Sequence, residues 1–191
     1  MRAFLSYDIE DQSFLQKVRE TQSEMALIGA DLKFVNPKIL HFTIRFLGEI
    51  DEADKEEIIS RLKGKVESFE LDIPFRGLGC FPDERRISVV WIGIDHSAGR
   101  QLEQQSQIVN KLLSPIKTLK EVDVEKFNPH VTIARMKSGK NKENLVSFIR
   151  ERKSKEFGVT KIQSLRLKLS TLTPSGPEYS DIHVFEKQQV V

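Results

Sequence analysis

One tetrapeptide pattern occurs twice in this chain, as His-Phe-Thr-Ile at 41–44 and as His-Val-Thr-Ile at 130–133. The chain has four histidines in 191 residues, so half of them belong to this pattern, and each copy follows shortly after an Asn-Pro pair. In an extended strand, residues i and i+2 point to the same face. Each histidine therefore shares a face with its threonine, while β-branched or aromatic residues occupy the opposite face. The repetition predicts two similar units, each with a strand that is polar on one side and apolar on the other.

The remaining hydrophobic pattern divides into short strands and amphipathic helices. A strand is expected at Phe4–Ile9, and Asp11 is a suitable N-cap for a following helix. That helix would bury Phe14, Leu15, Val18 and Met25. Further strands are expected at Leu32–Val35, Leu71–Leu78, Ile87–Ile94, Val159–Leu172 and Ile182–Phe185, and further helices at 52–69, 98–114 and 141–152.

Strands and helices follow one another with the same rhythm in both halves, and each half contains one motif. The simplest architecture is a single bilobal α+β domain over residues 1–191, internally duplicated, with one His-x-Thr-x motif per lobe (41–44 and 130–133). Two antiparallel sheets would face each other, with the helices on the outside. A pseudo-two-fold axis between the sheets would place His41 and His130 across a shared cleft.

Composition excludes several classes of protein. The net charge of +2 gives no strong case for nucleic-acid binding, and Cys80 is the only cysteine, so neither a disulfide framework nor a cysteine-based zinc site is expected. The sequence shows no long apolar segment of the kind found in signal peptides or membrane spans. We therefore expect a cytoplasmic protein, a monomer, with no membrane partner.

Two opposed imidazoles fit acid–base catalysis, since each can exchange a proton near neutral pH. Threonine hydroxyls can donate hydrogen bonds to the oxygens of a tetrahedral group held between them. In-line displacement at phosphorus places the attacking and leaving oxygens on opposite sides, so the pattern favours a phosphodiester substrate. The alternative is that both histidines are structural residues on half-buried strands.

Other chemistries have less support. Carboxylates or further histidines for a metal site do not accompany either motif, so we expect neither a metal nor any other cofactor. A serine-nucleophile motif and a phosphate-binding glycine loop are absent from the sequence, and Cys80 beside Phe-Pro is interpreted as a packing residue. His96 and His183 lack a threonine partner and are interpreted as structural or surface residues.

At these positions the chain resembles the 2H phosphoesterase superfamily, and within it the RNA 2′,3′-cyclic phosphodiesterases, historically called 2′-5′ RNA ligases. The resemblance covers nearly the whole chain. It rests on Arg2-Ala-Phe4, His41-Phe-Thr-Ile-Arg-Phe-Leu-Gly48, Phe81-Pro82, Arg85-Arg86, Trp91, Pro129-His-Val-Thr-Ile-Ala-Arg135 and Leu172-Thr-Pro-Ser-Gly-Pro-Glu-Tyr179.

The resemblance implies metal-independent hydrolysis of 2′,3′-cyclic phosphate ends of RNA to 2′-phosphates. Some members also join tRNA halves through a 2′-5′ bond without ATP, and this chain has no Lys-x-Asp-Gly motif of ATP-dependent ligases. By similarity, His41 is expected to be the general acid and His130 the general base. Thr43 and Thr132 would hold the phosphate.

Two further residues are candidates for substrate binding. Arg135 matches a family position that contacts phosphate, but strand alternation places it on the face opposite to His130, so a bulge or a strand end is required there. Its alternative role is that of a cation at the rim. Phe46 could stack on a base, although a place in the apolar core is the favoured interpretation.

Two rival functions stay open. One is a nucleotide- or RNA-binding module of the same fold without catalysis, against which the two complete His/Thr pairs argue. The other is a cyclic phosphodiesterase that acts on a small nucleotide such as ADP-ribose cyclic phosphate, and the low net charge is compatible with it.

Overall fold

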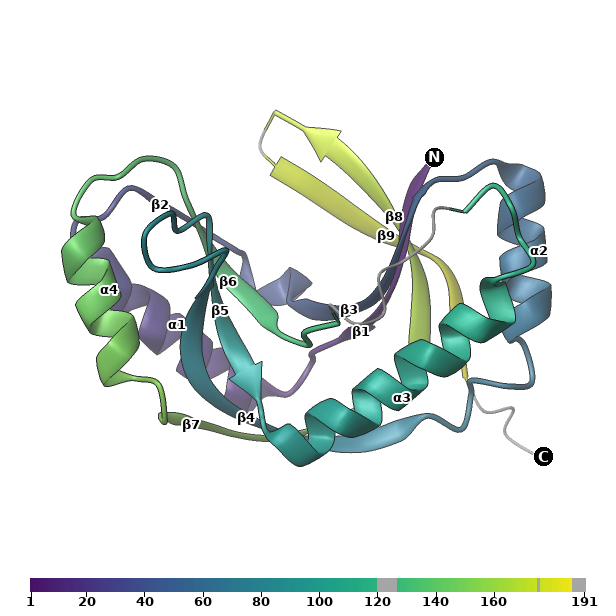
Figure 1. Cartoon of the computed structure of the whole chain (residues 1–191), viewed down its shortest axis with the longest axis horizontal. Coiled ribbons are helices and arrows are strands. Elements are labelled where there is room, and N and C mark those ends of the chain that lie inside the picture. The colour runs from purple at the N-terminus through teal and green to yellow at the C-terminus, as the bar shows by residue number, and fades with distance from the viewer. Residues whose placement is uncertain (120–126, 175, 187–191) are drawn as a thin grey trace.

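The computed structural model describes residues 1–119, 127–174 and 176–186. Two antiparallel sheets lie side by side, with helices on their outer sides (Figure 1). The elements are, in chain order, β1 (Arg2–Asp8), α1 (Gln12–Ala26), β2 (Leu32–Phe34), the short 3-10 helix η1 (Pro37–Ile39), β3 (His41–Glu49), α2 (Glu52–Leu62), β4 (Glu70–Phe81), β5 (Val89–Ile94), α3 (His96–Leu113), β6 (Val131–Met136), α4 (Lys142–Glu151), β7 (Glu156–Gln163), β8 (Leu165–Thr173) and β9 (Gly176–Phe185).

The two motifs belong to different sheets. The first sheet has the strand order β3-β1-β8-β9 and contains the first motif in β3. The second has the order β2-β6-β5-β4-β7, and its β6 begins at the residue after His130. The predicted α+β class with two antiparallel sheets and outer helices is therefore confirmed.

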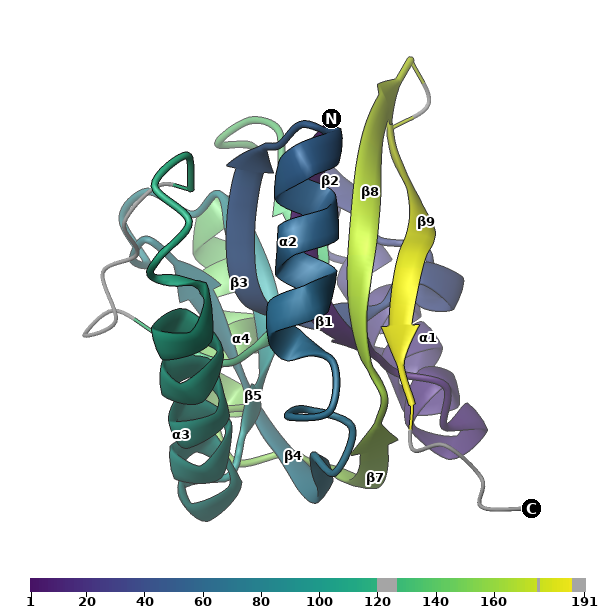
Figure 2. The same ribbon diagram turned by 90° about the vertical axis from the view of Figure 1, so that its right-hand side faces the viewer.

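The two sheets repeat one topology. Each half of the chain contains a β-α-β-α unit, β1-α1-β3-α2 in the first and β5-α3-β6-α4 in the second. In each sheet the motif strand lies beside the first strand of its unit, and two more strands follow. The order β3-β1-β8-β9 in one sheet therefore corresponds to β6-β5-β4-β7 in the other. The first helix of each β-α-β-α unit packs on the opposite sheet: α1 contacts β6 and β7, and α3 contacts β3 in addition to β4 of its own sheet. Figure 2 shows α2 and α3 together on the outer side of the first sheet. The lobes are therefore assembled from both halves of the sequence rather than from one half each.

Two expected boundaries were wrong. The helix expected at 52–69 ends at Leu62, because Gly64 lies just beyond the C-cap with a φ of 77°, a left-handed conformation that glycine adopts without strain. The single strand expected at Val159–Leu172 is two strands in two different sheets, separated by Ser164 with a φ of 65°. The change of sheet was not predicted, because residues 159–172 contain no glycine or proline that would indicate the end of a strand.

The helix cap and buried face predicted for α1 are confirmed. Asp11 accepts a hydrogen bond from the backbone N–H of Phe14 at 2.8 Å. Phe14 is buried, and its ring centroid lies 4.3 Å from that of Phe75 on β4, so α1 is fixed to the second sheet. Leu15 is 5% exposed, whereas Leu27 at the end of the helix is 89% exposed. In the described part of the chain, no helix is both long enough and apolar enough to span a membrane.

Leu15→Ala should reduce the free energy of unfolding by about 2–5 kcal/mol, since it removes a buried side chain and leaves a cavity under α1. Leu27→Ala is the matched control and should change stability by less than about 0.5 kcal/mol, because that side chain is already in water. Urea unfolding followed by circular dichroism measures both. Equal losses in the two variants would contradict the packing of α1 described above.

Candidate active site

The two motif strands meet where the sheets come together. β3 contacts β6, and the charge of His130 is close enough to act on His41. We call the surface of each sheet that carries the motif histidine and threonine its histidine face. Thr43 lies opposite Ser6 of β1, and Thr132 lies opposite Trp91 of β5, which places corresponding residues at corresponding points of the two sheets. A shared cleft between the histidines stays a prediction.

Both imidazoles are fixed in the same way. The Nδ1 of His41 lies 2.9 Å from the carbonyl oxygen of Ile39, and the Nδ1 of His130 lies 2.6 Å from that of Asn128. A carbonyl oxygen only accepts hydrogen bonds, so Nδ1 carries the proton and donates it in each ring. The Nε2 atom of each histidine is left to take or give a proton. The Asn-Pro pairs noted in the sequence shape this approach: Asn36 caps η1 ahead of the first motif, and Asn128 supplies the acceptor in the second.

Aromatic side chains pack around His41. The ring of Tyr179 on β9 lies edge-on, with centroids 5.0 Å apart, and the ring of Phe4 on β1 lies at 5.1 Å. Both residues were noted in the sequence only as part of the resemblance and were not assigned to the site. Tyr179 could be placed only after the pairing of β8 with β9 was known, because it is 138 positions from His41 (179 − 41).

The surroundings of His130 are also aromatic. Phe81 lies edge-on at 4.7 Å, and Trp91 lies at 6.2 Å. A Cβ added to Gly79 would come within 2.2 Å of the Trp91 ring, so the indole lies directly over this glycine. Phe81 and Trp91 were noted in the sequence only as part of the resemblance.

Burial lowers the pKa of both histidines below the usual value. For His41, removal from water is the largest cause, and the hydrogen bond to Ile39 and the charge of Asp8 oppose it. For His130, removal from water is again the largest cause, and the positive charge of Arg135 adds to it. Each imidazole is therefore readily deprotonated near neutral pH, as a proton-transfer group must be.

A β-bulge in each motif strand brings one more residue onto the histidine face. In the pairing of β3 with β1, Thr43 and Arg45 face consecutive residues, so Ile44 is the extra residue. In the pairing of β6 with β5, Thr132 and Ala134 face consecutive residues, so Ile133 is the extra residue. The bulge that the placement of Arg135 required is confirmed. Because of the extra residue, side chains after each threonine point to the face opposite to the one expected from simple alternation.

Phe46 and Arg135 occupy equivalent positions after these bulges. The ring of Phe46 is 6.3 Å from Phe4, which also contacts His41, so Phe46 lies on the histidine face. Its side chain is 68% exposed, so the favoured interpretation of Phe46 as a core residue was wrong. Arg135 is exposed, and its charge acts on both His130 and Tyr179.

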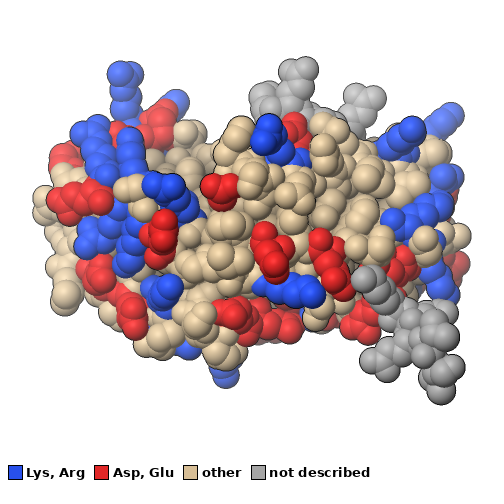
Figure 3. All heavy atoms as spheres, turned by 90° about the horizontal axis from the view of Figure 1, so that it is seen from below, with Lys and Arg blue, Asp and Glu red and all other residues tan. Residues whose placement is uncertain are grey.

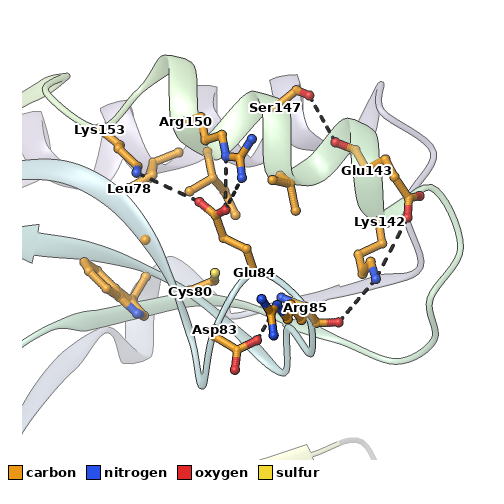
Figure 4. Close-up of a pocket in the computed structure, with 14 residues that line it drawn as sticks. Leu78, Cys80, Asp83, Glu84, Arg85, Lys142, Glu143, Ser147, Arg150 and Lys153 are labelled. Atoms are coloured by element: carbon orange, nitrogen blue, oxygen red, sulfur yellow. Dashed lines mark hydrogen bonds and ion pairs between the residues drawn. The ribbon is translucent and has the colours of Figure 1, made fainter.

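Another cavity is lined by neither motif histidine. It has a volume of about 1140 Å³ between α4, the end of β4 and the turn after it (Figure 4). Arg150 of α4 pairs there with Glu84 at 2.5 Å, and Lys142 donates to the backbone carbonyl of Arg85. These contacts connect α4 to the turn that follows Phe81 and so support a wall of the His130 site. Cys80 lines this cavity and is partly buried.

The other two histidines lie outside the site, as predicted. His96 is the first residue of α3 and is exposed. The ring of His183 packs against Phe185 with centroids 4.7 Å apart. Within residues 1–119, 127–174 and 176–186, no group of three or more His, Cys, Asp or Glu side chains is placed to hold a metal ion.

This fold and this pair of histidines define a family. Residues 3–184 match the family described as the AKAP7 2′5′ RNA ligase-like domain. The chain belongs to this family, and its resemblance to the 2H phosphoesterases is thereby confirmed.

Curated relatives and a solved structure agree with this placement. The chain is 32% identical to the RNA 2′,3′-cyclic phosphodiesterase of Methanothermobacter thermautotrophicus, over 97% of this chain and 98% of the relative. It is 34% identical to the protein of the same name from Archaeoglobus fulgidus, over 97% of this chain and 100% of the relative. The crystal structure of E. coli LigT complexed with 3′-AMP superposes with a TM-score of 0.73 over 98% of each chain at 17% identity, which shows a shared fold.

The lowered histidine pKa values predict how stability depends on pH. The unfolded chain binds more protons than the folded chain at and below the ordinary histidine pKa of about 6.5, so protonation favours unfolding there. Stability should fall between pH 7 and pH 5 and should fall less in the His41→Asn/His130→Asn double variant, whose amides can still donate to the same carbonyls. Urea unfolding at both pH values tests this, and an equal fall in the two proteins would contradict it.

Proposed function

We propose that this chain is an RNA 2′,3′-cyclic phosphodiesterase that hydrolyses cyclic phosphate ends to 2′-phosphates by two-histidine acid–base catalysis. The observation that carries the proposal is the pair of imidazoles, one in each motif, that are both fixed through Nδ1, each with Nε2 left to exchange a proton. The names of the curated relatives point to the same substrate.

In the proposed reaction, His130 takes a proton from water while the water oxygen forms a bond to phosphorus. The bond from phosphorus to the 3′-oxygen breaks, and His41 gives its proton to that oxygen. The product is a 2′-phosphate beside a free 3′-hydroxyl. Proton exchange with solvent restores both histidines, so atoms and charges balance without a metal or another cofactor.

Thr43 and Thr132 would donate hydrogen bonds to the two non-bridging oxygens of the phosphate, since each shares a face with its histidine. Arg135 would offset the negative charge that develops at phosphorus, because the bulge at Ile133 directs it to the same face. The exposed ring of Phe46 would stack on a base.

The substrate would be recognised at its end rather than along a long backbone. The net charge is only +2, and on the face shown in Figure 3 basic and acidic side chains are intermixed. Broad nucleic-acid surfaces carry an excess of positive charge instead. RNA ends with a cyclic phosphate, including those of tRNA halves, are therefore the proposed partners, and a 5′-hydroxyl in place of water would give a 2′-5′ bond.

The decisive experiment incubates the protein with an oligoribonucleotide that ends in a 2′,3′-cyclic phosphate, with and without EDTA, and identifies the product ends by mass spectrometry and phosphatase treatment. We expect a 2′-phosphate in both conditions. His41→Asn and His130→Asn should each lower kcat/KM by about 10²–10⁴-fold, the usual effect of losing a positioned acid or base.

His96→Asn is the matched control, since His96 is exposed on α3, and it should retain full activity. Full activity in the two motif variants, with retained nucleotide binding, would support the binding-module alternative. A preference for a small cyclic nucleotide over the oligoribonucleotide would support the other rival. Activity that EDTA abolishes and Mg²⁺, Mn²⁺ or Zn²⁺ restores would refute the metal-independent mechanism.

Base stacking on Phe46 gives a second prediction. Phe46→Ala should lower kcat/KM on the oligoribonucleotide by roughly 5- to 150-fold, equivalent to the 1–3 kcal/mol of one stacked base, while Phe46→Tyr should keep most of the activity. Leu172→Ala is the control, because Leu172 is similarly exposed at 72%. An abasic cyclic ribose phosphate should be hydrolysed equally by wild type and Phe46→Ala; an equal loss on both substrates would exclude stacking.

A further inference from the structure

A layer of charged side chains crosses three strands of the first sheet. Lys168 of β8 is 7% exposed, and its Nζ lies 2.5 Å from Oδ2 of Asp8 on β1 and 2.9 Å from Oδ1 of Asp181 on β9. Arg166 of β8 pairs with the same two carboxylates, at 3.4 Å and 2.9 Å. A buried ammonium held by two carboxylates is costly to assemble and leaves little freedom to any of the three groups.

This layer lies beside the first motif histidine. Asp8 is directly opposite His41 in the pairing of β1 with β3, and directly opposite residues of adjacent strands share a face. Lys168 is opposite Phe4, whose ring contacts the His41 ring. The charged layer and the imidazole are therefore on the same histidine face.

The second histidine has different neighbours. In the pairing of β5 with β6, Trp91 lies opposite Thr132 and Ile92 opposite Val131, and the same register continued by one residue would bring Gly93 opposite His130. The position that holds a carboxylate in one sheet thus holds a residue without a side chain in the other. Two histidines with the same backbone anchor consequently differ in the charge placed next to them.

We propose that Asp8, Lys168 and Asp181 are positioning residues that make His41, rather than His130, the histidine that is protonated when the reaction begins. The inference rests on the proposed function and adds to it the physical reason for the division of roles.

The charges around His41 act in opposite directions. Asp8 on β1 favours the imidazolium, whereas Lys168 on β8 and His130 from the second sheet disfavour it. Tyr179 on β9 contributes an uncharged ring edge. Lys168 therefore holds Asp8 in place and at the same time limits how strongly its charge acts.

Removing a negative charge and removing a positive charge near His41 should shift its pKa in opposite directions. In Asp8→Asn the imidazolium loses its carboxylate, so the pKa of His41 should fall by about one pH unit; in Lys168→Met the carboxylates are unopposed, and that pKa should rise by a similar amount. The alkaline limb of the pH profile of kcat/KM, which reports the general acid, should follow in both cases. The acid limb, which reports His130, should not move.

NMR titration of the imidazole resonances, assigned with the His41→Asn and His130→Asn variants, measures the same pKa values without any turnover. The inference can therefore fail while the proposed activity stands, and it can be examined even if that activity is absent. Lys161→Met is the matched control, because Lys161 of β7 is 58% exposed and pairs with Glu70 of β4 at 3.4 Å, and it should leave both limbs in place.

Three results would overturn the inference. Movement of the acid limb instead of the alkaline limb would make His41 the base. Lower activity with unchanged limbs would show that the layer only supports the fold. An unchanged His41 pKa in the NMR titration would show that the charges of Asp8 and Lys168 do not affect the His41 ring. If Lys168→Met does not fold, Asp181→Asn replaces it and should lower the His41 pKa, because it removes a carboxylate from the layer.

Discussion

One extra residue directly after the threonine of each motif determines which side chains reach the site. Ile44 and Ile133 interrupt the alternation directly after the threonines, so a third position follows each His/Thr pair onto the histidine face. Without the bulges, Phe46 and Arg135 would point toward the helices and the core. The site is therefore formed by backbone irregularities in two strands as much as by the residues of the motif.

The two imidazoles show how one local geometry can serve opposite tasks. Each donates from Nδ1 to the carbonyl two residues earlier, which fixes the tautomer and the direction of Nε2. What distinguishes them comes from more distant segments: Asp8 with its buried lysine lies opposite His41, whereas the register of β5 with β6, continued by one residue, would bring Gly93 opposite His130. The local sequence fixes the tautomer of each histidine, and residues from distant strands influence its protonation state.

The sequence predicted what depends on local patterns. The repeated tetrapeptide revealed both histidines, and helical periodicity predicted the buried face of α1. Ser164 was missed, because a strand that changes sheet keeps its composition. Phe46 was placed in the core because a single phenylalanine in an apolar strand does not reveal a bulge. The charged layer was missed since Asp8 is 160 positions from Lys168 (168 − 8) and the two meet only through the pairing of β1 with β8.

The crossing of α1 and α3 between the sheets has a consequence for the origin of the site. In a chain with one β-α-β-α unit, the helix face that here packs on the opposite sheet could be buried on a second copy, in an exchanged dimer whose two identical histidines are related by exact symmetry. Both copies would then have carried the same neighbours. Fusion into one chain removes that constraint, so that a carboxylate can arise beside one ring without arising beside the other, and a symmetric pair can become an acid and a base.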